Sequence, residues 1–91
     1  MSAFRDMLAR QDDAALAAVA SVGLLRRARL RLAEGDTPAC VEETAQDARV
    51  KVGTHIVDLS AAGPGHARCE CPATGLCRHI LIAVLHLRET L

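Results

Sequence analysis

Apolar and polar residues follow a helical spacing over the first 36 residues of the chain. Apolar side chains recur there three and four positions apart, beginning with Phe4, Met7 and Leu8. A second helix is expected to start at Asp12 or the next residue and to be interrupted at Gly23, and a third is expected over residues 24–34. Residues 1–36 are therefore predicted to form a helical N-terminal region.

The pattern changes to short runs of β-branched residues between residues 37 and 65. Polar and apolar residues alternate strictly in Arg49-Val50-Lys51-Val52, which is typical of a strand with one buried face. We predict an antiparallel meander, with strands near residues 39–44, 48–52 and 54–60 and a fourth over residues 66–69.

The last part of the chain is predicted to be a helix that begins at Leu76 or Cys77. Its apolar residues fall on one broad face, formed by Ile80, Leu81, Val84, Leu87 and Leu91. The helix reaches the last residue without a Gly or Pro stop signal, which weakly indicates a longer parent protein. These patterns together predict an α+β fold, with the helical region 1–36 followed by a sheet and terminal helix over residues 37–91.

Composition restricts the residue types that can form the core and the classes of function that the chain can have. Phe4 is the only aromatic residue in a chain that is 51% hydrophobic, so the core must be aliphatic. Eleven basic and eleven acidic residues cancel, which gives no overall electrostatic reason to expect nucleic acid. Charged residues near the start (Arg5, Asp6, Arg10) argue against a signal peptide, so none is expected, and the Ala-rich stretch 14–25 is too short to span a membrane. A cytoplasmic location, with reduced thiols, is expected.

Candidate chemistry is concentrated in a CxC-x5-CxH pattern made by Cys69, Cys71, Cys77 and His79. Three thiols and one imidazole are a complete tetrahedral ligand set for zinc. On a strand, residues two apart point to one face, so Cys69 and Cys71 can approach one ion. Inside a helix residues two apart do not face each other, so Cys77 and His79 can share the ion only at a helix start. The pattern predicts a structural Zn²⁺ that joins a strand end to a helix start.

Other chemistries fit this segment less well. A disulfide would leave one thiol over and give His79 no role, and an iron–sulfur cluster usually takes four Cys at wider spacings. The His-x-Glu and Pro-Cys-x-x-Cys motifs of zinc deaminases do not occur. A closed four-ligand shell has no position at which water could be activated. We therefore expect no enzymatic activity and no catalytic residues.

The segment from Arg68 to Leu85, RCECPATGLCRHILIAVL, resembles the SWIM zinc finger family, whose signature is CxC…CxH. The resemblance is specific over about residues 48–89 and includes the Cys-Pro step and the apolar helix after Cys-x-His. It implies a ββα arrangement in which the two Cys of CxC, the third Cys and the His are the metal positions. It also implies a module that binds DNA or proteins.

Arginines are the remaining candidates for contacts with a partner or with the metal centre. A basic cluster (Arg26, Arg27, Arg29 and Arg31) is either a face that contacts phosphate or the solvated side of an amphipathic helix. We favour the second interpretation, because no aromatic residues are interleaved for base stacking. Arg68 and Arg78 flank the ligands, and they either offset the negative charge of a zinc–thiolate centre or are ordinary surface charges.

The remaining Cys and His residues have no motif partners. Cys40 is expected to be a small buried hydrophobe next to a strand. His55, His66 and His86 are expected to be surface or half-buried residues outside any site.

The predicted function is that of a structural zinc-binding SWIM module that mediates macromolecular interaction. A protein partner, or the remainder of a longer chain, is preferred because the charge is balanced, and neither a membrane nor a small-molecule substrate is expected. The contact would be an apolar patch made from those of Leu81, Leu85 and Leu87 that the core leaves exposed. The alternative is DNA binding through the zinc finger, the Arg26–Arg31 face and the start of the last helix.

Overall fold

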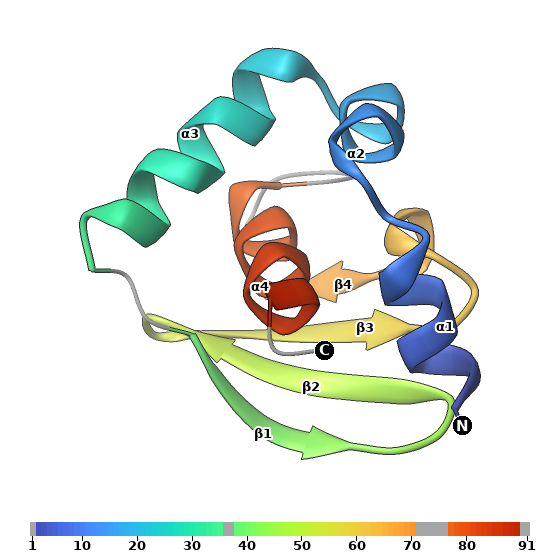
Figure 1. Cartoon of the computed structure of the whole chain (residues 1–91). Helices are drawn as coiled ribbons and strands as arrows, with labels where there is room; N and C mark the ends of the chain where they lie inside the picture. Colours follow the sequence, from blue (N-terminus) through green and yellow to red (C-terminus); the bar gives the residue numbers. More distant parts are fainter. Residues whose placement is uncertain (1, 36–37, 71–76, 90–91) are drawn as a thin grey trace.

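The computed structural model describes residues 2–35, 38–70 and 77–89, which form an α+β fold as the sequence predicts (Figure 1). Its elements, in chain order, are α1 (Ala3–Ala9), α2 (Asp13–Val19), α3 (Val22–Ala33), β1 (Ala39–Glu43), β2 (Asp47–Val52), β3 (His55–Ser60), the short 3₁₀ helix η1 (Pro64–His66), β4 (Arg68–Cys69) and α4 (Arg78–Glu89). The helices gather on one side of a four-stranded antiparallel sheet of order β1-β2-β3-β4.

The three N-terminal helices each begin at a side chain that caps them. The side-chain oxygens of Ser2, Asp12 and Ser21 accept the backbone N–H three residues on, at 3.0, 2.8 and 3.0 Å. The predicted interruption at Gly23 is wrong, because α2 ends at Val19 and Gly23 lies in the first turn of α3. A glycine inside a helix costs only about 1 kcal/mol, and a good cap contributes a similar amount, so the cap sets the boundary.

Strand β2 follows the predicted alternation closely. In β2 the residues Ala48, Val50 and Val52 are buried and the residues between them are exposed. The turn from β2 to β3 contains Gly53, whose φ of 61° is a left-handed value that favours glycine. The predicted fourth strand is shorter than expected, because residues 64–66 form η1 and only Arg68–Cys69 pairs with β3.

Helix α4 lies at the centre of the molecule, between the sheet and the other helices (Figure 1). Every residue from Ile80 to Leu85 is buried, and so is Leu87. Residues of the sheet, of α1 and of α3 belong to the same core, among them Val50, Val57, Phe4, Leu8 and Leu25. The predicted apolar patch on this helix is therefore wrong, since Leu81, Leu85 and Leu87 are covered from several sides at once.

Ion pairs join the N-terminal helices to the rest of the chain. Arg5 of α1 reaches Glu43 of β1 with two nitrogens, at 2.8 and 3.1 Å. The carboxylate of Asp13 contacts Arg29 of α3, and Arg88 of α4 at 3.2 Å. The hydrogen bond from Arg88, supported by Arg29, holds the pKa of Asp13 below its ordinary value.

Candidate metal centre

The end of β4 and the start of α4 bring together Cys69, Cys77 and His79. Their possible ligand atoms all lie within 4.8 Å of one another, and Cys77 Sγ is 3.8 Å from His79 Nδ1. Two ligands of one tetrahedral zinc, bound at about 2.0–2.3 Å, are about 3.5–3.8 Å apart. Cys77 is buried, and Cys69 and His79 are half-buried. The three side chains therefore form a group that could bind a metal ion.

Strand register directs Cys69 toward the helices. Cys69 lies opposite Val57, a fully buried residue of the inner sheet face, and Arg68 lies opposite Asp58. Directly opposite residues in an antiparallel pair share one face of the sheet. Cys69 therefore shares the inner face with Val57, and Arg68 shares the outer face with Asp58.

The first turn of α4 places the other two ligands. The carbonyl oxygen of Cys77 accepts the backbone N–H of Leu81 at 3.3 Å, which is the first hydrogen bond of the helix. His79 follows inside that first turn. The prediction that Cys77 and His79 converge at a helix start is thus confirmed. Cys71, the fourth predicted ligand, lies outside the described residues and stays a prediction.

His55 belongs to this site although its sequence context did not indicate a partner. It begins β3, and its ring stacks on that of His79 with centroids 4.3 Å apart and planes inclined by 29°. His55 is half-buried, as expected, but the stacking places it beside His79 of the candidate metal group, which its sequence context did not indicate. The position of His55 follows from the strand register. Because Val57 pairs with Cys69, His55 lies at the end of β3 nearest the C-terminal end of β4.

The two arginines beside the ligands have different positions. Arg68 is on the sheet face opposite to Cys69, so it is better described as a surface charge than as a counter-charge for the metal group. Arg78 is the first residue of α4, between Cys77 and His79 in the chain, and it is exposed.

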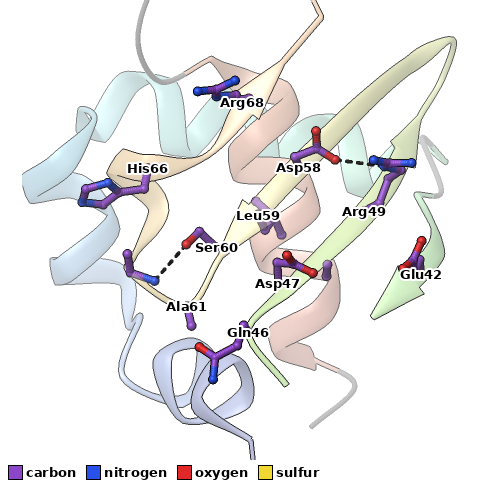
Figure 2. Close-up of a pocket in the computed structure, with 12 residues that line it drawn as sticks. Glu42, Gln46, Asp47, Arg49, Asp58, Leu59, Ser60, Ala61, His66 and Arg68 are labelled. Carbon is purple, nitrogen blue, oxygen red and sulfur yellow. Dashed lines mark hydrogen bonds and ion pairs between the residues drawn. The ribbon is translucent and has the colours of Figure 1, made fainter. Parts of the chain in front are cut away.

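The outer face of the sheet carries a hollow of about 550 Å³, shown in Figure 2. One charged residue from each strand crosses it in register, with alternating sign: Glu42, Arg49, Asp58 and Arg68. Arg49 Nε lies 3.1 Å from Asp58 Oδ1, and this bond raises the pKa of Arg49 above its ordinary value. The described lining also includes Asp47, so three carboxylates stand against two guanidinium groups, and this hollow has no positive excess that would attract an anion.

Two further sequence predictions concern exposure. Cys40 is exposed, so the expectation of a buried residue is wrong. It lies in the edge strand β1, all of whose residues are exposed although Cys40 is opposite the buried Val50. His66 is exposed and His86 is half-buried, as expected.

The arginines of α3 all lie on its exposed side, with Leu25 and Ala28 buried behind them. They are not equivalent. Arg29 pairs with Asp13, whereas Arg27 and Arg31 line a second hollow, together with Leu30, Glu34 and Arg78.

No protein-family model, no curated protein and no solved structure matches the chain. In the described ranges, no helix combines the length and the apolar character that crossing a membrane requires.

Proposed function

We propose that the chain is a zinc-stabilised module of the SWIM type that mediates macromolecular interaction and catalyses no reaction. The observation that carries the proposal is the convergence of Cys69, Cys77 and His79 within 4.8 Å. Two sulfur donors and one imidazole nitrogen suit zinc better than the hard cations, which prefer oxygen. Cys71, two residues after Cys69 in the sequence, is proposed as the fourth ligand.

The position of the group supports a structural role for the metal. It lies where β4 ends and α4 begins, and α4 is the helix around which the core is built. When bound, zinc would supply folding energy by fixing these two elements to each other. A chain of 91 residues buries a small core, so such a contribution matters to its stability.

Elemental analysis of protein purified under reducing conditions tests the proposal. We expect one zinc per chain, lost in Cys77→Ser and in Cys71→Ser. Cys40→Ser is the matched control, because Cys40 is exposed in β1 and is not part of the metal-binding group. Absence of stoichiometric zinc, or equal thiol reactivity with and without zinc, would contradict the proposal.

The partner is the less determined part of the proposal. A protein partner was expected through leucines of the last helix, and those leucines are buried, so only the balanced charge still favours it. The second candidate, nucleic acid, is favoured by a specific observation: arginines of α3 and α4 line one hollow.

A further inference from the structure

A hollow of about 320 Å³ lies where the C-terminal half of α3 meets the first residue of α4. It is lined by Arg27, Leu30 and Arg31 of α3 and by Glu34, the residue that follows the helix. These residues lie three, four and seven positions apart and so share one face. Arg78 comes from α4, which packs against α3. Among the described residues, three arginines from two elements thus line one hollow, with Glu34 as the single carboxylate.

Two of these arginines, Arg27 and Arg78, are not used by the ion pairs that stabilise the described part of the fold. Within the residues that the structure describes, neither Arg27 nor Arg78 makes an ion pair, in contrast to Arg29, which contacts Asp13. Placing like charges side by side is unfavourable, and a bound anion would relieve it. The hollow therefore has an excess of positive charge, whereas the lining of the hollow on the outer sheet face is negative by one.

Guanidinium groups match phosphate in shape as well as in charge, since their planar fork donates two parallel hydrogen bonds. Arg27, Arg31 and Arg78 are all exposed, so one contact to one phosphate would be weak in water. A strand with repeated phosphates can engage several of them at once and release counterions. Leu30, which is 56% exposed, adds an apolar contact of the kind that a sugar ring can cover.

We infer that this hollow binds the phosphate backbone of a nucleic acid strand. The chain's only Phe, Tyr or Trp residue, Phe4, is buried, and no aromatic ring of the described residues lines the hollow, so binding should be independent of sequence. The inference deepens the nucleic-acid candidate above, and it rests on the proposed zinc site in one respect. Zinc would hold the first turn of α4, and thereby Arg78, against α3.

The test is fluorescence anisotropy of a labelled 20-nucleotide oligothymidylate with the zinc-loaded full chain, from 20 to 200 mM salt. Three phosphate contacts predict a slope of about −2 in a plot of log affinity against log salt. Arg27→Gln and Arg78→Gln should each weaken binding about five- to tenfold at low salt and reduce the slope by about 0.7. Glu34→Gln should strengthen binding, because it removes the one opposing charge.

Arg26→Gln is the matched control, since Arg26 is an exposed neighbour on α3 that does not line the hollow. At 200 mM salt its affinity should stay within about twofold of the parent chain, as expected for loss of a charge that makes no direct phosphate contact and is screened by salt. Equal losses in Arg26→Gln and Arg27→Gln, or no salt-dependent binding by zinc-loaded protein, would overturn the inference.

Competition identifies the source of the phosphate. Pyrophosphate that displaces the strand only at millimolar concentration supports the inference, whereas displacement at micromolar concentration, or tighter binding of a phosphoserine peptide, overturns it. The zinc content of each sample separates the two proposals. If zinc-loaded protein does not bind the strand, only the phosphate site is refuted. If the purified protein contains no zinc, the metal proposal is refuted.

Discussion

Helices α3 and α4 have the same length, twelve residues, and pack against each other, yet they are built in opposite ways. Helix α4 buries residues on every side, and two of the three residues that could bind a metal lie at its start, Cys77 just before the helix and His79 in its first turn. Helix α3 buries only Leu25 and Ala28 and turns its arginines to solvent. The comparison shows a structural difference: α4 forms the centre of the core, whereas α3 covers the core with one face and presents charged side chains to solvent.

Removal of the metal should have the largest effect on the stability of α4. Structural zinc contributes on the order of 10 kcal/mol to folding in finger peptides, a large quantity for a small domain. Chelation or Cys77→Ser should therefore abolish amide-exchange protection in α4 and in β3, and α3 should loosen as a consequence. Unchanged protection of α4 after zinc has been removed would show that burial alone holds this helix.

A matched pair of leucines tests burial directly. Leu81 of α4 is fully buried and Leu30 of α3 is 56% exposed. Leu81→Ala should lower the free energy of unfolding by about 2–5 kcal/mol, because it leaves a cavity in the core. Leu30→Ala should change it by about 0.5 kcal/mol or less. Urea unfolding of zinc-loaded protein measures both, and similar losses in the two variants would contradict this structural difference between the helices.

Local patterns in the sequence were sufficient for the element types and for much of the candidate site. The alternation around Val50 predicted β2, and the spacing of Cys77 and His79 predicted their convergence at a helix start. Both signals depend on residues close together in the chain. The α+β fold class follows from the same local periodicities.

Errors and omissions arose where the outcome depends on distant parts of the chain. The burial of Leu85 requires knowing that α1, α3 and the sheet all cover α4. The exposure of Cys40 depends on β1 being the edge strand, and the role of His55 depends on the register between β3 and β4. Periodicity reports how many faces an element buries, but it does not identify the neighbours that cover them.

The stacking of His55 on His79 is expected to help orient the His79 ring at the start of α4. An aromatic pair contributes about 0.5–1.5 kcal/mol, so His55→Ala should weaken zinc binding about two- to tenfold by leaving the ligand ring less well oriented. Competition with a chromophoric chelator measures the affinity. His66→Ala is the control, since His66 is exposed and lines the outer hollow instead. Equal affinities of the two variants would mean that the stacking has no role in orienting His79.

The smallest expected effect concerns Asp13, which contacts Arg29 of α3 and Arg88 of α4 and so links the two contrasted helices. Its folded pKa lies below the ordinary value of 3.8, first because of the hydrogen bond from Arg88. A carboxyl group whose pKa is lowered by folding stabilises the protein fully above its unfolded pKa, and this contribution is lost as the pH falls through the folded value. Asp13 is exposed, so the gain is small at any pH.

Asp13→Asn should therefore melt slightly below the parent chain at pH 5–7, and the difference should shrink as the pH falls below about 3.8, the ordinary pKa of the group. Thermal melts of the two chains measure this difference in melting temperature. The other titratable groups are common to both chains, so their contributions cancel. Asp6→Asn is the control, because Asp6 makes no ion pair with the described residues. A difference between parent and Asp13→Asn that grows toward low pH would have the wrong sign for a lowered pKa. The link between α3 and α4 would then rest on their apolar contact alone.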